Sequence, residues 1–270
     1  MSEELFELEL LGGAVEQAYR EQRPEVLTMP WGTIDPSLYP PELVLAAQES
    51  WTGAAFQEHR TGAACAATLQ SLIEARAPVD LIALASRFPL DEMVHVELCS
   101  RLAMEFGGGA SITYEPDAMV ATVGQGQAPL LRASHQVVAF FCVGEALSIP
   151  LLHGAWQACT HPLTKAVLKR IVQDEADHGT FGWLYLDWAL QHLEPQDLVA
   201  LGQTADLAID GVLLNWDAIR ARPKAAREHV HDLGWMQTDA YLDLAASSLD
   251  RYVLKPLAAR GVPTRRQAAR

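Results

Sequence analysis

Apolar residues recur every three or four positions along most of the chain, which is the spacing of amphipathic helices, and the alternation typical of β-strands is weak everywhere. This periodicity predicts six long helical stretches, over residues 42–76, 78–106, 134–159, 163–193, 195–222 and 237–260. Half of the residues are hydrophobic, which is enough to bury a sizeable core. The pattern therefore predicts an all-α protein.

Proline and glycine mark the borders of these stretches. Residues 1–41 hold five prolines and leave room for one short helix near residues 3–20, so we expect an N-terminal extension there. Residues 107–133 are rich in glycine and predict a long crossover between the second and third long helices. Pro89 predicts either a kink or a fresh helix start, and Pro150 predicts a kink.

These borders predict one main domain, a bundle of the first four long helices over residues 42–193. The two later helices, within residues 194–260, are expected to pack on that bundle as part of the same domain. Residues 261–270 carry three arginines and are expected to form a flexible tail.

The charge balance is acidic, because 34 Asp and Glu against 20 Lys and Arg give a net charge of −14. Such a chain is expected to bind neither nucleic acid nor an anionic membrane. No apolar run reaches the roughly 18 residues of a membrane span, and the acidic N-terminus is unlike a secretory signal, so we expect a cytoplasmic protein. Four scattered cysteines suit buried thiols in a reducing compartment, and they are Cys65, Cys99, Cys142 and Cys159.

Two segments share one chemical pattern, an Asp-Glu pair with a His three residues after the Glu. The residues of the two motifs are Asp91, Glu92, His95 and Asp174, Glu175, His178. On an α-helix, residues three apart differ by about 60° of rotation and about 4.5 Å of rise, so the Glu and His of each motif can reach a common ion. One such pair is common by chance, whereas two in one chain form a much more specific signal.

A further glutamate precedes each motif by the length of a helical hairpin. Glu58 lies 34 residues before Glu92, and Glu145 lies 30 residues before Glu175. Each interval fits a helix, a turn and a returning helix that reaches the same level. The chain therefore looks like a duplicated hairpin, the arrangement in which two helices give one Glu each and two give Glu-x-x-His.

All four glutamates fall on the apolar face of their predicted helices. Each of them alone is more often a surface glutamate, but burying an unpaired carboxylate costs on the order of several kcal/mol, and no Lys or Arg lies near the middle of these faces. Cations from outside are therefore expected, and four Glu with two His suit two iron or manganese ions. The predicted metal ligands are Glu58, Glu92, His95, Glu145, Glu175 and His178.

Residues around these ligands are expected to support the site. Asp91 and Asp174 are predicted to accept the second ring N–H of a ligating His, and the alternative for both is a solvated helix residue. Small residues near the ligands are expected to leave a cavity for O₂ and a substrate, and they are Ala55, Gly62, Cys65 and Ser148.

With these motifs the chain resembles the ferritin-like di-iron carboxylate superfamily over about residues 42–193. The order of ligands is similar to that of bacterial multicomponent monooxygenase hydroxylases and ribonucleotide reductase small subunits. Arylamine N-oxygenases and aldehyde-deformylating oxygenases share the same skeleton. The resemblance implies a ferritin-like four-helix bundle with two iron ions, bridged by Glu92 and Glu175, at which catalysis takes place.

The resemblance also implies hydrogen bonds across the bundle, from His178 to Asp91 and from His95 to Asp174. One helical turn past His95, reductase small subunits carry a radical tyrosine, whereas this chain has Cys99, as hydroxylases do. A tyrosyl-radical role is therefore disfavoured.

Three functions stay open at this point. The first is an oxidase or oxygenase that uses O₂ as co-substrate on a small organic substrate, with a reductase or ferredoxin as electron donor and a homodimer as one arrangement. The second is a ferroxidase or iron-handling protein with no organic substrate. The third is a relic that binds one ion for stability. Fe/Fe and Mn/Fe centres both fit the predicted ligands.

Overall fold

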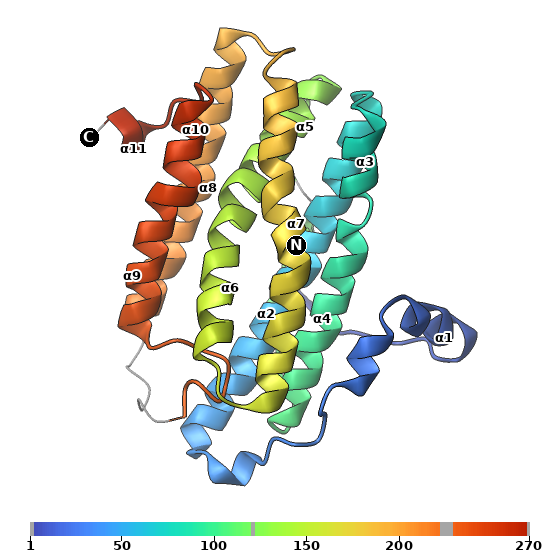
Figure 1. Ribbon diagram of the computed structural model, residues 1–270. Coiled ribbons are helices and arrows are strands. Elements are labelled where there is room, and N and C mark those ends of the chain that lie inside the picture. The colour runs from blue at the N-terminus through green and yellow to red at the C-terminus, as the bar shows by residue number, and fades with distance from the viewer. Residues whose placement is uncertain (1–2, 120–121, 222–228, 269–270) are drawn as a thin grey trace.

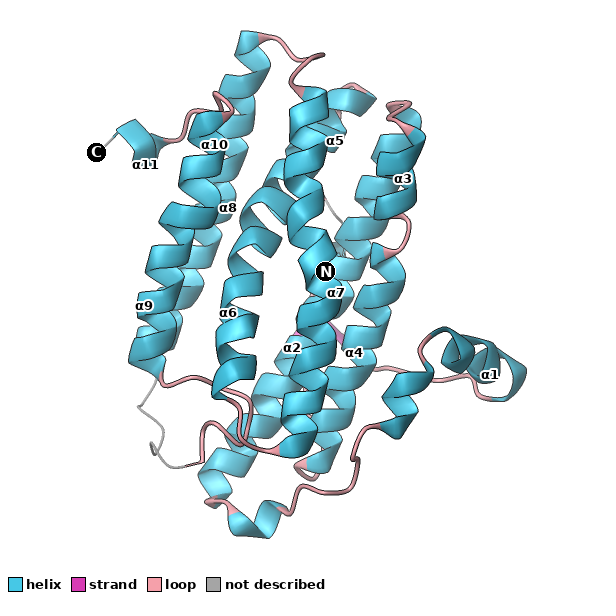
Figure 2. Cartoon of the chain, viewed as in Figure 1, coloured by secondary structure: helices cyan, strands magenta, loops and turns pink. Residues whose placement is uncertain are grey.

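Helices make up nearly all of the regular structure in the computed structural model, which describes residues 3–119, 122–221 and 229–268 (Figure 1, Figure 2). Within these ranges the only strands are β1 (Glu4–Leu5) and β2 (Thr113–Tyr114), which pair antiparallel. The predicted all-α class is confirmed.

Four long helical rods lie side by side in the centre of the molecule (Figure 1). Three are single helices: α2 (Pro41–Glu74), α4 (Phe88–Glu105) and α7 (Pro162–Ala189). The fourth, called the composite rod here, joins α5 (Pro129–Val137), the π-helix η4 (Val138–Glu145) and α6 (Ala146–Ala158). Contacts close the ring, because α2 packs on α4 and α5, and α7 packs on α4 and α6.

Prolines set several of the observed borders. Pro89 lies in the first turn of α4 and α3 (Val79–Ala85) is a separate helix, so this proline marks a fresh helix start and not a kink. The composite rod begins at Pro129, earlier than expected, which shortens the crossover; that crossover contains β2 and η3 (Pro116–Met119). Pro150 lies inside α6, and the irregular backbone comes before it, in η4.

The N-terminal extension differs in detail from the prediction. Its helix α1 spans Gly13–Gln22, because the segment before it forms β1 and lies on α2, where the Phe6 ring contacts Phe56 and His59. Two short 3₁₀-helices follow, η1 (Pro24–Thr28) and η2 (Pro36–Leu38).

Helices at the C-terminal end form a second layer against the composite rod (Figure 1). They are α8 (Pro195–Ala221), α9 (Thr238–Ser248), the π-helix η5 (Leu249–Leu254), α10 (Lys255–Ala259) and α11 (Arg265–Ala268). The segment that was expected to form a flexible tail lies against α8 up to residue 268, where Val262 and Thr264 are buried and Arg265 pairs with Asp206 and Asp210.

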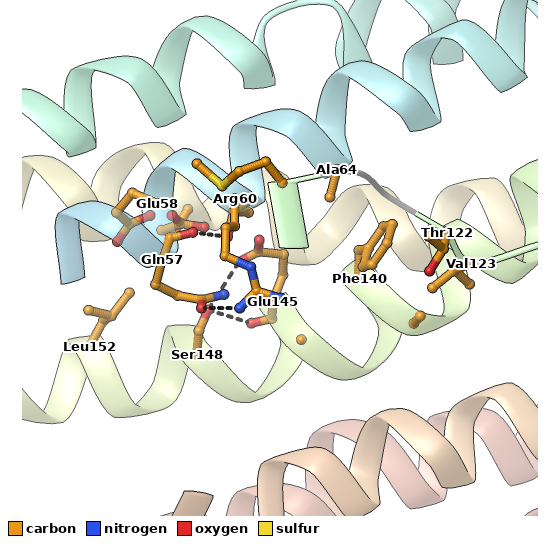
Figure 3. A pocket seen from close by; sticks show the side chains of 15 residues that line it. Gln57, Glu58, Arg60, Ala64, Thr122, Val123, Phe140, Glu145, Ser148 and Leu152 are labelled. Atoms are coloured by element: carbon orange, nitrogen blue, oxygen red, sulfur yellow. Dashed lines mark hydrogen bonds between the residues drawn. The ribbon is translucent and has the colours of Figure 1, made fainter. Parts of the chain in front are cut away.

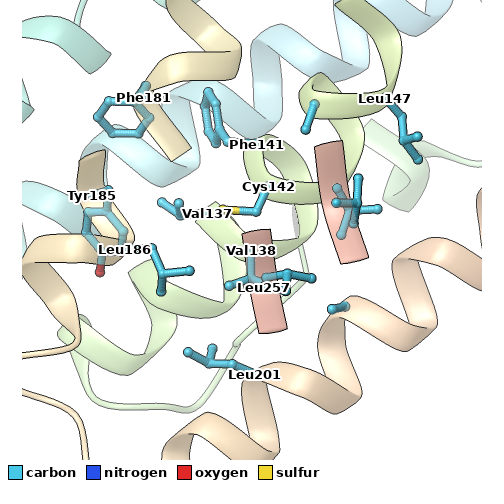
Figure 4. Packing of buried hydrophobic residues seen from close by; sticks show 14 of the residues in the cluster. Val137, Val138, Phe141, Cys142, Leu147, Phe181, Tyr185, Leu186, Leu201 and Leu257 are labelled. Atoms are coloured by element: carbon cyan, nitrogen blue, oxygen red, sulfur yellow. The ribbon is translucent and has the colours of Figure 1, made fainter. Parts of the chain in front are cut away.

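Two apolar clusters fill the bundle, one toward each end. On α7, for example, the first cluster begins at Phe181 and includes Tyr185 (Figure 4). The second cluster ends on this helix at Ile171. The same division falls between Phe88 and Val94 on α4. The predicted metal ligands occupy the gap between the clusters, so apolar packing above and below positions a polar layer in the middle.

Among the described residues, Pro129–Ala158 is the one stretch whose length and apolar composition would suit a membrane span. Of its most apolar window, 56% is buried inside the protein. The central rod of a helical bundle has the same properties, so this evidence for a membrane span is weak.

Candidate metal centre

The structure brings all six predicted metal ligands into one buried layer. They form two groups, each with candidate ligand atoms that all lie within 4.8 Å of one another. The first group is Glu58, Glu92, His95 and Glu175, and the second is Glu92, Glu145, Glu175 and His178. Because Glu92 and Glu175 belong to both groups, the arrangement has the form of two adjoining ion sites with two shared carboxylates.

Both imidazoles turn the same ring atom, Nδ1, toward the shared carboxylates. His95 Nδ1 lies 3.6 Å from Glu92 Oε2, 3.3 Å from Glu175 Oε1 and 3.8 Å from Glu58 Oε2. His178 Nδ1 lies 3.1 Å from Glu92 Oε1 and 3.1 Å from Glu175 Oε2. Each shared glutamate thus presents one oxygen to each histidine, the geometry of a carboxylate that bridges two ions.

Gly62 lets α2 approach α4 closely at the level of the ligands. A Cβ atom at this position would lie 2.6 Å from Met93 Cε and 3.2 Å from Glu92 Cβ. The small residue therefore brings Glu58 near the motif on α4. This close approach also fills the space at Gly62, which had been expected to form part of a cavity.

The π-helix η4 delivers Glu145, its last residue. A π-helix shifts the direction of the side chains that follow, and such insertions are frequent at functional sites. Opposite η4, a Cβ atom on Gly182 would lie 2.9 Å from Phe141 Cβ and 3.1 Å from Cys142 N. Gly182 therefore allows the backbones of α7 and η4 to pack closely just beside the ligands.

Several inward-facing atoms of the layer are buried and make no hydrogen bond among the described residues. They are Glu92 Oε1 and Oε2, Glu175 Oε2, His95 Nδ1 and His178 Nδ1. Leaving one buried polar atom unpaired costs about 1–3 kcal/mol, and more for a charged group. Carboxylate oxygens and imidazole nitrogens are also ligands of iron and manganese. The donor set therefore fits two divalent metal ions.

Protons supply part of the missing positive charge in the metal-free protein. Burial raises the pKa of Glu58 to about 8, against a lowering contribution from His95. Burial, followed by the negative charges of Glu175 and Glu92, raises the pKa of Glu145 well above its usual range. These two glutamates are the ones that each belong to a single ligand group, and a metal ion would displace their protons.

The pKa values of the two histidines shift in the opposite direction to those of ordinary buried imidazoles. Burial alone would lower their pKa, but the surrounding carboxylates raise the pKa of both His95 and His178 far above the usual range. Burial alone would likewise raise the pKa of Glu175, yet its contacts with the two imidazoles hold that pKa below the usual range. The carboxylates of the layer therefore favour the charged form of both rings, as they would favour any other cation.

The two aspartates face the outer ring atoms of the histidines, as the resemblance implied. His95 Nε2 lies 3.4 Å from Asp174 Oδ2, which is within hydrogen-bond distance. His178 Nε2 lies 3.7 Å from Asp91 Oδ2, which is longer than a hydrogen bond. The structure therefore shows one of the two cross-bundle hydrogen bonds and only a close contact at the other position.

Arginines hold both aspartates. Arg87 Nε donates to Asp91 at 2.8 Å and Arg23 donates to the other oxygen of the same carboxylate, while Arg170 Nε donates to Asp174 at 2.9 Å. Burial alone would raise the pKa of Asp91, but its hydrogen bonds hold that pKa far below the usual range. Both carboxylates are therefore fixed in place beside the imidazoles.

The sequence-based prediction did not include these arginines. Arg87 and Arg170 each stand four residues before the aspartate that they bind, so both motifs read Arg-x-x-x-Asp-Glu-x-x-His, a repeat visible in the sequence. Arg23 lies 68 residues before Asp91 and comes from the N-terminal extension. No local pattern points to that contact, because it depends on how the extension folds back.

A cavity of about 360 Å³ reaches the layer from one side (Figure 3). Glu58, Glu145 and Glu175 line its inner end. Of the four small residues expected to border a cavity, Ser148 does so, and its hydroxyl donates to Glu145 Oε2 at 3.0 Å. The other three are not among the lining residues.

Comparisons with known proteins supply no relative, since no protein-family model, curated protein or solved structure matches the chain. The chemistry of the site therefore carries the functional assignment.

Proposed function

We propose that this chain is a ferritin-like di-metal carboxylate protein that uses O₂ to oxidise a small organic substrate. The proposal extends the observed helical bundle to a specific family and the observed Glu and His cluster to a specific cofactor. Two iron ions are the proposed occupants, and a Mn/Fe pair is the variant that the same ligands would accept.

The observation that carries the proposal is the set of buried, inward-facing atoms without hydrogen bonds, which includes both oxygens of Glu92 and Nδ1 of both histidines. A core built only for stability would satisfy these atoms within the protein. Their convergence in two overlapping groups supports two ions and not one. The adjacent cavity gives a small molecule access to the same groups.

In this proposal each residue has a definite task. Glu92 and Glu175 would be shared by both ions, and each histidine would hold one ion through Nδ1, the ring atom that faces these glutamates. Glu58 and Glu145 would each hold one ion on the side of the cavity.

The outer contacts orient the ligands. Asp174 and Asp91 face Nε2 of the histidines, which leaves Nδ1 of each ring for the metal, and the arginines hold both carboxylates in place. Apolar packing above and below the layer excludes water from those two sides. When bound, two iron ions supply the redox chemistry by which O₂ is reduced.

The experiment is anaerobic loading with Fe(II), followed by exposure to O₂ with a chemical reductant in place of the proposed reductase or ferredoxin. We expect about two iron ions per chain and O₂ consumption that exceeds the iron present, since a catalyst turns over. A panel of small organic compounds then identifies oxidised products by mass spectrometry. A glutamate-to-alanine variant at Glu92 serves as the inactive control.

The iron-handling alternative uses the same ligands and predicts different results. It would give O₂ consumption that does not depend on an organic compound, no oxidised organic product, and a large hollow assembly in solution. Those three results together would replace the oxygenase proposal. Fewer than two ions per chain would reject the di-metal centre itself.

A further inference from the structure

A second cavity, of about 600 Å³, lies on another face of α6. Called the outer groove here, it follows α6 between α7 and α9, which pack on either side of that helix (Figure 1). None of its lining residues belongs to the cavity at the ligand layer. Its volume falls within the range of about 300–1,000 Å³ that is typical of small-molecule sites. The outer groove is therefore a separate site of a size that suits a small molecule.

Close contacts between helices form the floor of the outer groove. A Cβ atom on Gly179 of α7 would overlap Ile149 Cδ1, and one on Gly154 of α6 would lie 2.7 Å from Leu244 Cδ2 of α9. The two glycines therefore let the three helices approach one another closely. Ile149, Pro150 and Gly154 all line the groove, and none of them has a polar side chain. The part of the floor that α6 provides there is thus apolar.

Two aromatic side chains form part of the wall, Trp183 of α7 and Tyr252 of η5. The guanidinium carbon of Arg260 lies 5.0 Å from the centre of the Trp183 ring, and that of Arg251 lies 5.1 Å from the centre of the Tyr252 ring. Arg260 in turn donates to both carboxylate oxygens of Asp187, at 2.7 and 2.9 Å. Both rings are therefore held in defined positions. Aromatic rings attract further aromatic rings beyond the effect of the apolar area that they bury.

Ser248 of α9 places a buried hydroxyl in the lining of the groove. Its side chain is 1% exposed, and its Oγ makes no hydrogen bond among the described residues. A buried hydroxyl without a partner is costly, and such groups are rare in folded proteins. The adjacent Ser247 also lines the groove, but its hydroxyl donates to the Leu244 carbonyl at 2.9 Å. The Ser248 hydroxyl therefore marks the point at which a ligand would be held by a hydrogen bond.

The lining favours a neutral ligand. The described lining residues include no Asp or Glu, and the two that can carry a positive charge, His153 and Arg251, are exposed. A charged group beside Ser248 would be buried with a single hydroxyl as its partner, which is costly. A hydroxyl group on the ligand can instead donate to Ser248 or accept from it.

From this arrangement we infer that the outer groove is a second ligand site, which binds a small neutral aromatic alcohol. The ring system of the ligand lies on the apolar floor beside Trp183 and Tyr252, and its hydroxyl forms a hydrogen bond with Ser248. The inference goes beyond the proposed function, because it involves no predicted metal ligand and no residue that lines the cavity at the ligand layer.

The test is calorimetric titration of the full-length protein with three probes that share one ring system. Two of them, 2-naphthol and naphthalene, are neutral, and 2-naphthoate is charged. We expect 2-naphthol to bind wild-type protein about 3- to 10-fold more tightly than naphthalene, the range for one neutral hydrogen bond, and more tightly than 2-naphthoate. Ser248→Ala deletes the hydroxyl alone, so it should abolish the preference for 2-naphthol over naphthalene and leave the affinity for naphthalene unchanged.

Two variants of the adjacent serine serve as controls. Ser247→Ala removes a hydroxyl that already has a partner in the protein, so the preference for 2-naphthol is expected to persist. Ser247→Trp places a large side chain in the outer groove and is expected to weaken the binding of 2-naphthol and naphthalene equally. Circular dichroism verifies that each variant is folded, and analytical ultracentrifugation measures the state of association.

Several results would overturn the inference. Equal binding of 2-naphthol and naphthalene to wild-type protein, or a preference that survives Ser248→Ala, would show that Ser248 does not hold the ligand. Tighter binding of 2-naphthoate than of 2-naphthol would exclude a neutral ligand. Affinities that Ser247→Trp leaves unchanged would place the probes outside the outer groove. A dimer that Ser247→Trp dissociates would show that a second copy of the chain covers it.

Discussion

The two halves of the candidate centre supply the same three kinds of ligand from different backbones. In the first half, Glu58 lies on α2, an α-helix without interruption from Pro41 to Glu74. In the second half, Glu145 ends a π-helix within a rod that also contains Pro150. The motifs on α4 and α7 are alike. The two halves therefore differ in the backbone that carries the single glutamate, a regular α-helix for Glu58 and a π-helix for Glu145.

Both halves border the cavity. Its lining includes Ala139, Phe140 and Gly144 of η4 and residues 57, 61 and 64 of α2, whereas α4 contributes none. A π-helix shifts the direction of the side chains that follow, so Glu145 reaches the cavity from a distorted backbone and Glu58 reaches it from a regular one.

The largest expected effect is on metal content, which should differ between variants of the shared glutamates and variants of the unshared ones. Glu92→Ala or Glu175→Ala removes a carboxylate that belongs to both groups, so we expect loss of both ions. Glu58→Ala or Glu145→Ala removes a ligand of one group, so we expect loss of about one ion of the two. Metal analysis of desalted, Fe(II)-loaded protein measures this. Full occupancy in Glu92→Ala would contradict a bridging role.

A smaller loss of Fe(II) affinity is expected when the arginines that bind the two aspartates are replaced. Asp174 is held by Arg170, whereas Asp91 is held by both Arg87 and Arg23. We therefore expect Arg170→Gln to weaken Fe(II) binding by about 10-fold, toward the low end of the range for such outer contacts, and Arg87→Gln to weaken it less. Competition with a chromogenic chelator gives both affinities. Equal losses would show that the two aspartates are not held differently.

The raised pKa of Glu58, about 8, predicts how metal binding depends on pH. Below pH about 8 its carboxyl is protonated in the metal-free protein, and the incoming ion must displace that proton; above this pH the group is already ionised. We therefore expect nearly one proton fewer to be released per chain at about pH 9 than at about pH 7. Calorimetry in buffers of different ionisation enthalpy counts the protons. An unchanged count would mean that the Glu58 carboxyl does not titrate between about pH 7 and pH 9, against the raised pKa.

The last comparison concerns the free energy of unfolding, and it replaces in turn the two glycines at the close helix contacts. A Cβ at Gly182 meets the Cys142 backbone and Phe141 Cβ, which cannot move easily, so Gly182→Ala should lower the free energy of unfolding by about 1–3 kcal/mol. A Cβ at Gly62 meets mainly the flexible end of Met93, and the gain in helix propensity offsets part of the strain, so Gly62→Ala should change it by less than about 1 kcal/mol. Urea denaturation of both variants measures the difference. If Gly62→Ala lowered the free energy of unfolding more than Gly182→Ala, the tighter contact would be that between α2 and α4.

The sequence was informative about the ligand layer because its signal is local and repeated. Helical periodicity and the spacing of Glu58, Glu92, Glu145 and Glu175 were sufficient to predict that these residues meet on one level, and the structure brings them together. Spacing alone says which side chains share a level and a face, which is what the prediction required.

The features missed from sequence depend on tertiary contacts. The π-helix η4 arises where the composite rod packs on α7, and apolar periodicity does not distinguish it from an α-helix over eight residues. The arginines after Gly261 pair with aspartates of α8 that lie about 55 residues earlier, and no local pattern in the sequence points to that contact. The contact between Arg23 and Asp91 likewise depends on tertiary structure, because the two residues lie 68 positions apart.

The account depends most on two ions in the layer between the histidines, and anomalous scattering tests this directly. Crystals of Fe(II)-loaded protein, measured on both sides of the iron and manganese absorption edges, locate and identify each ion. We predict two peaks, one beside His95 Nδ1 and one beside His178 Nδ1, both in contact with Glu92 and Glu175. A single peak, or peaks only on the protein surface, would contradict the di-metal centre.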